Sequence, residues 1–484
     1  MEKNENNRLF FIQKGGLELV FTKSILEKNI ELIELIEVFH QKRDGEERSR
    51  YMLLINNIKG YNKLIRMLFN QSETEKKYDY KYIKLIVSIL EDSSHLEEVR
   101  KSLHDIKEID KLFKEAFSRF DISDKSLMSN EQVVVIIMHL FTFIGNLCYS
   151  GQDIRQKIST QFSMIIERVY KFLEFFEVDN IIHRNILETV LSFLINLSCD
   201  DKFRENLGKE TKLIRYLITR VMKGVIEKFS SQNQKIFVQY DDIYEKICCL
   251  IYNLTFTNNN NISNTTLTYQ EKYVSIEYYI ELGIIEIIKN YLEKIFNTNF
   301  DFTSEASVLR TLMLTSKLTK STSGELFGSK FYNLIISVTN KNFLKRDSKF
   351  VDNTIKILAH YLQNKNKKIV SSEVNLELLS ENLREIFLLD YPSIDRDKEK
   401  ERTINNMSLM ISLVGNAPSL SEKFREIVKL LIEIAKEKMD LLRKNSAILL
   451  AKIAKSSKSM ENCVRELHGM DVLMNVSKFI QINK

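Results

Sequence analysis

The residue types that catalyse reactions or bind metals are scattered along this chain. Its seven histidines form no HExxH motif, and no two of them lie at helical spacing. No GxxxxGK[ST] or GxGxxG phosphate-binding loop occurs, nor any GxSxG or kinase motif. The five cysteines lack CxxC spacing and lie mostly in apolar runs, so we interpret them as buried thiols. We therefore predict that the protein is not an enzyme and has no metal, cofactor or small-molecule substrate.

Asparagine, in contrast, recurs in a regular context near the end of long apolar stretches. Asn146 lies in FTFIGNLCYS, Asn196 in LSFLINLSCD and Asn253 in KICCLIYNLTF. Asparagine is a poor helix former, because its amide competes for backbone hydrogen bonds. Two explanations stay open at this point. The amide faces a solvent-lined surface and binds a partner, or it caps or bonds within its own repeat.

Length and composition indicate what kind of fold carries these asparagines. With 484 residues the chain is too long for one compact core, which predicts several domains or a repeat array. Hydrophobic residues make up 44% and charged residues 28%, as in ordinary folded proteins. Only 2 prolines and 13 glycines interrupt the Leu-, Ile-, Lys- and Glu-rich stretches, and strand signals are scarce. We expect helices almost throughout.

The apolar helices repeat when they are aligned on the asparagine. The alignment puts Ser88, His360 and Lys452 in the same place in three other helices. Asn146 and Asn196 are 50 residues apart, whereas Asn196 and Asn253 are 57 apart. HEAT and armadillo repeats have a period of ~40–47 residues, so these spacings correspond to one such unit plus an insertion.

Glycines give a second repeating signal. After each apolar helix comes a polar break, then a short helix, and often a glycine before the next apolar helix. Glycine there permits a tight junction between two helices that meet at a steep angle. The glycines in this position are Gly16, Gly60, Gly208, Gly283, Gly328 and Gly469.

This order of elements resembles the armadillo repeat over nearly the whole chain. The resemblance implies an all-α, armadillo/HEAT-like right-handed α-solenoid over residues 1–484. Polar, loop-like insertions are expected near 255–270, 297–307 and 389–402, the last marked by a proline and a charge run.

In the armadillo family the third helix of each repeat lines a concave groove, and its asparagine holds an extended peptide by the backbone. The resemblance thus implies a partner-binding groove formed by Asn146, Asn196, Asn253, His360 and Lys452. The nuclear-import adaptors of this family add a tryptophan one turn earlier. This chain has no tryptophan, and it carries Thr142, Ser192 and Cys249 near those positions.

The segment 441–476 resembles the last repeats of proteins that join tetratricopeptide repeats to an armadillo array, such as UCS-type myosin chaperones and a dynein-arm assembly protein. That resemblance implies a non-catalytic scaffold. It would serve as a co-chaperone or assembly factor for a cytoskeletal motor or axonemal complex, with a chaperone or motor heavy chain as partner. Two alternatives remain: a nuclear-transport or small-GTPase-regulating adaptor, and a structural subunit of a larger complex.

Charge and hydropathy bear on partners and location. The 71 Lys and Arg residues are interspersed with 65 Asp and Glu residues, giving a net charge of +6 without a dense basic stripe. We therefore expect no nucleic-acid partner. The N-terminus has no signal-peptide core, and no uninterrupted run of 18 apolar residues occurs, so we expect no membrane association. An odd number of cysteines without disulfide spacing favours the cytoplasm, with the nucleus as the alternative.

Overall fold

The computed structural model shows a chain of helices, with no β-strand among the residues that it describes. Contacts divide the chain into two compact units, unit 1 (Met1–Leu282) and unit 2 (Gly283–Lys484). The residues described are 10–11, 14–27, 30–40, 45–69, 80–104, 109–229, 234–255, 276–297, 305–322, 327–338, 348–362, 374–394, 396–437 and 441–482.

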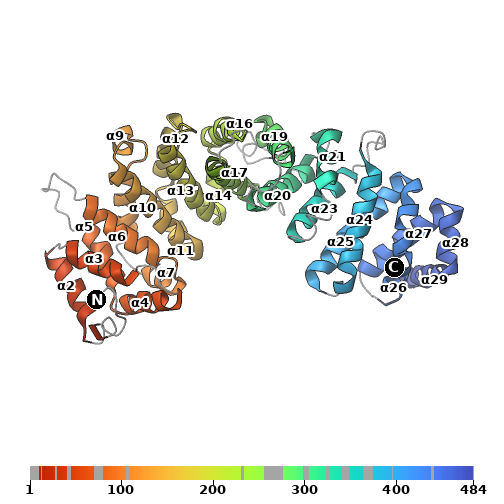
Figure 1. Cartoon of the computed structure of the whole chain (residues 1–484), viewed down its shortest axis with the longest axis horizontal. Coiled ribbons are helices and arrows are strands. Elements are labelled where there is room, and N and C mark those ends of the chain that lie inside the picture. The colour runs from red at the N-terminus through yellow and green to blue at the C-terminus, as the bar shows by residue number, and fades with distance from the viewer. Residues whose placement is uncertain are drawn as a thin grey trace. The chain divides into compact units, whose positions relative to one another are not determined.

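Unit 1 is a succession of longer and shorter helices (Figure 1). Its helices are α2 (Gly16–Glu27), α3 (Ile30–His40), α4 (Gly45–Asn57), α5 (Gly60–Phe69), α6 (Tyr80–Ser93), α7 (Glu97–His104), α8 (Ile109–Arg119), α9 (Lys125–Met128), α10 (Glu131–Ser150), α11 (Gln152–Ser159), α12 (Phe162–Glu174), α13 (Ile181–Leu197), α14 (Asp201–Gly208), α15 (Thr211–Tyr216), the π-helical turn η1 (Leu217–Met222), α16 (Lys223–Lys228), α17 (Gln234–Leu254) and α18 (Ile276–Glu281).

Four long helices of unit 1 stack in chain order: α10 packs between α6 and α13, and α13 packs on α17. Side-chain caps fix where two of them begin. Asn130 accepts hydrogen bonds from the first turn of α10, and Asn180 does the same for α13. Between the stacked helices, the rings of Phe117, Phe141 and Phe193 meet with centroids 5.3 to 6.0 Å apart. The stack therefore places the ends of successive long helices next to one another.

Unit 2 has a comparable stack of long helices, in which α20, α23, α25 and α27 contact one another in that order. Its helices are α19 (Ile284–Asn297), α20 (Glu305–Thr322), α21 (Gly328–Val338), α23 (Ser348–Leu362), α24 (Leu376–Asp390), the 3-10 turn η6 (Tyr391–Ser393), α25 (Asp397–Asn416), the 3-10 segment η7 (Pro418–Ile427), α26 (Val428–Glu437), α27 (Leu441–Ser456), α28 (Lys458–Glu466) and α29 (Gly469–Ile482).

The glycines predicted at helix junctions lie at helix ends. Gly283 has φ +83° immediately before α19, a conformation that side chains with a Cβ rarely adopt. At the start of α5, a Cβ on Gly60 would lie only 2.7 Å from the Phe21 ring. The first glycine permits a left-handed turn, and the second permits close packing.

Helices α24 and α25 extend into the region 389–402, where the sequence predicted a polar insertion, and leave a shorter break between them. Helix α24 continues to Asp390, a 3-10 turn contains Pro392, and α25 begins at Asp397. Proline is compatible with the first turn of a helix, and Asp397 and Glu399 are favourable at a helix N-terminus. The proline therefore lies in a 3-10 turn between two helices, and the charge run forms the beginning of α25. The other two predicted insertions fall mainly on 256–270 and 298–304, outside the described residues.

Helix α10 is long and apolar enough to cross a membrane by length and composition alone. Its Glu131–Tyr149 window has a mean hydropathy of 1.7, and 61% of that window is buried inside the protein. Because α10 packs against α6 and α13, this hydropathy is also that of a central core helix.

Candidate partner-binding surface

The three asparagines lie near the C-terminal ends of α10, α13 and α17, and each joins its helix to the preceding long helix. Each Nδ2 donates one hydrogen bond: Asn146 to Ser94 Oγ (2.9 Å), Asn196 to Gly145 O (3.0 Å) and Asn253 to Ser198 Oγ (2.9 Å). We call these three side chains with their acceptors the asparagine ladder. These Nδ2 bonds run between repeats, not within one repeat as the second of the two sequence-based explanations supposed.

The two serines of the ladder occupy equivalent places. Ser94 and Ser198 each follow the end of a long helix, and each hydroxyl donates to the carbonyl three residues earlier. With its own hydrogen committed, the hydroxyl oxygen is free to accept from an asparagine. The sequence alignment placed Ser88 in the row of the asparagines, whereas the serine that accepts from Asn146 is Ser94, more than one turn further along the chain.

The amide oxygens of the ladder asparagines are available to a ligand. All three side chains are half-buried, and their Oδ1 atoms have no hydrogen-bond partner among the described residues. None of these oxygens is among the buried polar atoms that lack a partner. Each therefore reaches the surface as an unused acceptor.

His360 and Lys452, which belong to unit 2, occupy the corresponding place on their helices. His360 Nδ1 of α23 shares a hydrogen bond of 3.0 Å with Thr319 Oγ1 of α20. Lys452 Nζ of α27 donates to the Ile411 carbonyl of α25 at 3.0 Å. Burial lowers the pKa of His360, and the positive charges of Lys320 and Lys356 lower it further. Both side chains thus contact the preceding long helix, as the asparagines do.

Charged side chains lie on the same helical faces as the asparagines. Glu188 is two turns before Asn196 on α13, and its Oε1 lies 3.3 Å from Lys246 Nζ on α17. Burial raises the pKa of the neighbouring Asp242, and the Glu188 carboxylate adds to that rise. Sequence reasoning missed these residues, although counting back in steps of one turn from each asparagine would have found them.

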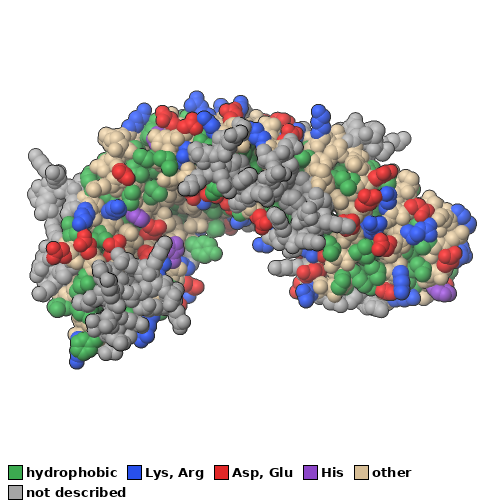
Figure 2. Space-filling view, viewed as in Figure 1, with side chains coloured by type: hydrophobic (Ala, Val, Ile, Leu, Met, Phe, Trp, Pro, Cys, Tyr) green, Lys and Arg blue, Asp and Glu red, His purple; other side chains and the backbone are tan. Residues whose placement is uncertain are grey.

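Charges of both signs alternate over the described residues on the face drawn in Figure 2. Among the residues that the structure describes, no group of three or more His, Cys, Asp or Glu side chains could hold a metal ion. All five cysteines are free thiols, of which Cys148 and Cys248 are buried and Cys199 is exposed. Burial raises the pKa of the Cys148 thiol, which keeps it protonated.

No protein-family model matches the sequence, and no curated protein matches it. Solved structures do resemble the fold. SYS-1 superposes with a TM-score of 0.55 at 11% identity, covering 92% of this chain and 75% of that one. SYS-1 in its complex with POP-1 gives a TM-score of 0.54 at 12% identity, covering 92% of this chain and 76% of that one.

A chain from a study of the phosphorylation switch between cadherin and beta-catenin gives a TM-score of 0.50 at 12% identity, covering 95% of this chain and 91% of that one. At such identities the likeness concerns the fold alone. The stacked helices and these superpositions define the class of this protein, an all-α, armadillo/HEAT-like right-handed α-solenoid. This confirms the predicted fold class.

Proposed function

We propose that the protein is a protein-interaction scaffold that holds an extended partner segment across the stacked helices α10, α13 and α17 of unit 1. The observation that carries the proposal is the row of three amide oxygens on the asparagine ladder, each accessible and without a described partner. A row of acceptors on successive helices suits the regularly spaced N–H groups of an extended backbone.

The ladder bonds would fix the geometry of such a site before a partner arrives. Because each Nδ2 is already held by the preceding helix, the Oδ1 acceptor has a set direction, and little side-chain entropy is lost on binding. One turn before two of the asparagines stand Thr142 and Ser192, both short and partly exposed. Their size leaves room for partner side chains, without the aromatic clamp of the nuclear-import adaptors.

The narrower proposal is a co-chaperone or assembly factor for a cytoskeletal motor or axonemal complex, acting in the cytoplasm. It is supported by the resemblance of residues 441–476 to the last repeats of tetratricopeptide–armadillo proteins. Two structural neighbours fit a general binding role, since one is SYS-1 in complex with POP-1 and the other comes from a study of cadherin and beta-catenin. An adaptor controlled by a small GTPase would instead show nucleotide-dependent binding.

A specific observation favours a second candidate, a structural subunit of a larger complex. All three ladder Nδ2 groups are used inside the protein, so the asparagines already have a role in stability. In that case the helical face would carry no peptide, and partners would bind elsewhere.

A sharp test blocks the surface without breaking the ladder. The Thr142→Arg/Ser192→Arg double variant adds two bulky charges beside Asn146 and Asn196. A matched control, Gln152→Arg/Gln156→Arg, adds the same charge on exposed positions of α11. Each form is expressed in the native cell, crosslinked and purified, and the crosslinked sites are mapped by mass spectrometry.

We expect wild type and control to crosslink partners at α10, α13 and α17, and the Thr142→Arg/Ser192→Arg variant to lose them while remaining folded. Chaperones together with motor heavy chains among those partners would support the assembly-factor version. If the Thr142→Arg/Ser192→Arg variant keeps its partners and they crosslink to other helices, partner binding at the asparagine ladder is refuted. That result would favour the structural subunit.

A further inference from the structure

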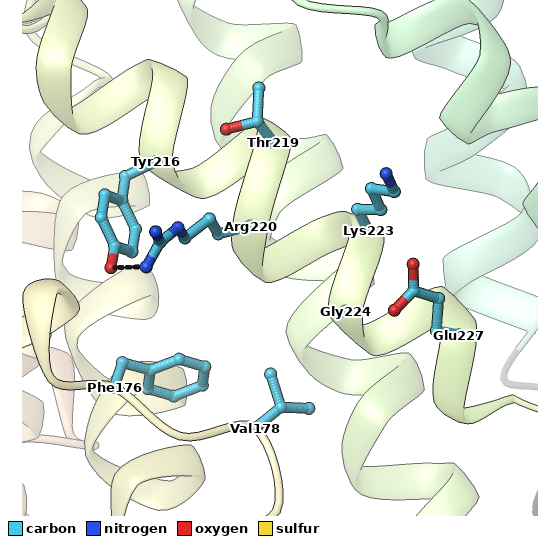
Figure 3. Close-up of a pocket in the computed structure, with 8 residues that line it drawn as sticks. All are labelled: Phe176, Val178, Tyr216, Thr219, Arg220, Lys223, Gly224 and Glu227. Atoms are coloured by element: carbon cyan, nitrogen blue, oxygen red, sulfur yellow. Dashed lines mark hydrogen bonds between the residues drawn. The ribbon is translucent and has the colours of Figure 1, made fainter.

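A second cleft lies in unit 1, away from the asparagine ladder. It has a volume of about 330 Å³ and lies between the α12–α13 loop and the helix formed by α15, η1 and α16. Figure 3 shows the lining residues, which are Phe176, Val178, Tyr216, Thr219, Arg220, Lys223, Gly224 and Glu227. The ladder uses the C-terminal end of α13, whereas this cleft uses the loop before its N-terminus.

The loop that forms the apolar wall is held in place by the first turn of α13. His183 Nδ1 accepts a hydrogen bond from the Glu177 backbone N–H at 3.1 Å, and its ring lies 6.2 Å from the Phe176 ring. Arg184 donates from Nη1 to the Val178 carbonyl at 2.8 Å. Burial lowers the pKa of His183, which favours the neutral ring that can accept this bond. Phe176 and Val178 are thus presented in a fixed arrangement.

The opposite wall contains a π-helical turn, Leu217–Met222, inside an otherwise α-helical stretch. Such turns are rare and are frequent at functional sites. Thr219, Arg220 and Lys223 are exposed along this wall. On the α16 wall, a Cβ on Gly224 would lie 3.2 Å from the Val178 side chain, so glycine leaves room for Val178 to approach the helix.

The charge of the cleft is positive. Arg220 donates from Nη1 to the Tyr216 hydroxyl at 2.9 Å and stacks over its ring at 5.1 Å. No described carboxylate forms an ion pair with Arg220 or Lys223, and Glu227 is the single acidic side chain in the lining. A guanidinium without a carboxylate partner is suited to bind a carboxylate or phosphate through two parallel hydrogen bonds.

We propose that this cleft binds an acidic segment of a partner protein, in which a side chain bearing an oxyanion adjoins an apolar side chain. The oxyanion, a carboxylate or a phosphate, binds the Arg220 guanidinium, Lys223 adds positive charge further along the same wall, and the apolar side chain packs on Phe176 and Val178. The volume is at the lower end of that of ligand pockets, so it suits one or two side chains of a segment that crosses the surface. This site is independent of the asparagine ladder.

The test uses the full chain and three blocked pentapeptides, acetyl-Gly-Leu-X-Leu-Gly-amide, with aspartate, phosphoserine or asparagine as X. Binding is measured by saturation-transfer difference NMR titration. The Arg220→Gln/Lys223→Gln variant removes both cations. The Lys212→Gln/Arg215→Gln variant makes the same charge change at exposed positions of α15, outside the cleft.

We expect the aspartate or the phosphoserine peptide to bind wild type at least tenfold more tightly than the asparagine peptide. The Arg220→Gln/Lys223→Gln variant should lose that preference, and the Lys212→Gln/Arg215→Gln variant should keep it. The tighter of the two acidic peptides identifies the oxyanion. Equal binding of all three peptides, no binding of any, or an equal loss in both variants would overturn the proposal.

Discussion

At the scale of the residue, the asparagine ladder accounts for polar side chains inside apolar helices. Asn196 donates across the helix interface to the Gly145 carbonyl, so its amide contributes to stacking. We predict that Asn196→Ala destabilises the protein by about 1–2 kcal/mol, through the lost bond and the unsatisfied carbonyl. Urea unfolding measures the change.

Asn185→Ala is the matched control for this prediction. Asn185 lies three turns earlier on the same face of α13, and its side chain makes no hydrogen bond to a described residue. Both substitutions gain the same helix propensity, so their difference isolates the ladder bond. Equal unfolding midpoints for the two variants would show that the bond adds nothing.

A second residue-scale prediction concerns two carboxylates that share one arginine in unit 2. Arg402 of α25 donates from Nε to Asp390 Oδ2 at 2.7 Å, whereas its Nη1 is 3.9 Å from Asp352 Oδ1. Burial raises the pKa of Asp352 to about 6, against the lowering effect of Arg402. The Arg402 guanidinium lies closer to the Asp390 carboxylate than to that of Asp352. The negative charge of Asp352 is therefore only partly compensated.

The sign of the pH dependence follows from this. A carboxyl whose pKa is higher in the folded state contributes stability below its unfolded pKa, and that contribution is lost as the pH rises through its folded pKa. We expect Asp352→Asn to stabilise the protein by ~1 kcal/mol at pH 7.5, after allowance for partial exposure, and by nothing at pH 4. Unfolding midpoints across this pH range test it.

Asp397→Asn provides a control of opposite sign. Asp397 is exposed in the first turn of α25, where a negative charge is favourable, so its loss should cost a few tenths of a kcal/mol at pH 7.5. A destabilising Asp352→Asn at pH 7.5 would mean that the attraction to Arg402 outweighs burial.

At the scale of the element, a side-chain cap stabilises the start of α13, and the first turn of this helix holds the loop that lines the second cleft. Asn180 caps α13, its Oδ1 accepting from the backbone N–H groups of Ile182 and His183. We predict that Asn180→Ala costs about 1 kcal/mol, and Asn180→Gly only a few tenths. Gln161 stands at the same position of α12 without a side-chain cap bond, so Gln161→Ala should change the unfolding free energy little. Similar losses at both positions would contradict the capping role.

The sequence predicted the helices and their stacking better than it predicted the contacts of single side chains. Apolar periodicity and junction glycines such as Gly60 and Gly283 were enough to predict stacked helices, and Asn146, Asn196 and Asn253 lie in equivalent places as expected. The acceptors of their amides were not predictable, because only the stacking brings the Ser94 and Ser198 hydroxyls and the Gly145 carbonyl near them. The π-helical turn and the loop that face each other across the cleft left no signal in the sequence, since neither has a distinctive composition.

At the scale of the whole molecule, the division into two units predicts which helices a destabilising core substitution will unfold. In stacked-repeat proteins each repeat contacts only its neighbours, so stability is lost locally first. Leu449 of α27 is fully buried, and Leu449→Ala should cost about 2–5 kcal/mol. We expect hydrogen exchange measured by mass spectrometry to accelerate in α25 to α29 and to stay unchanged in α6 to α17.

A matching substitution in the core of unit 1 tests whether each unit unfolds independently of the other. Leu194 of α13 is equally buried, and Leu194→Ala should accelerate exchange in α10 to α17 while leaving α25 to α29 unchanged. Acceleration along the entire chain in both variants would show that the two units unfold as one cooperative body. A partner that binds the asparagine ladder should then slow exchange in unit 1 alone under the two-unit behaviour, and in both units under the cooperative one.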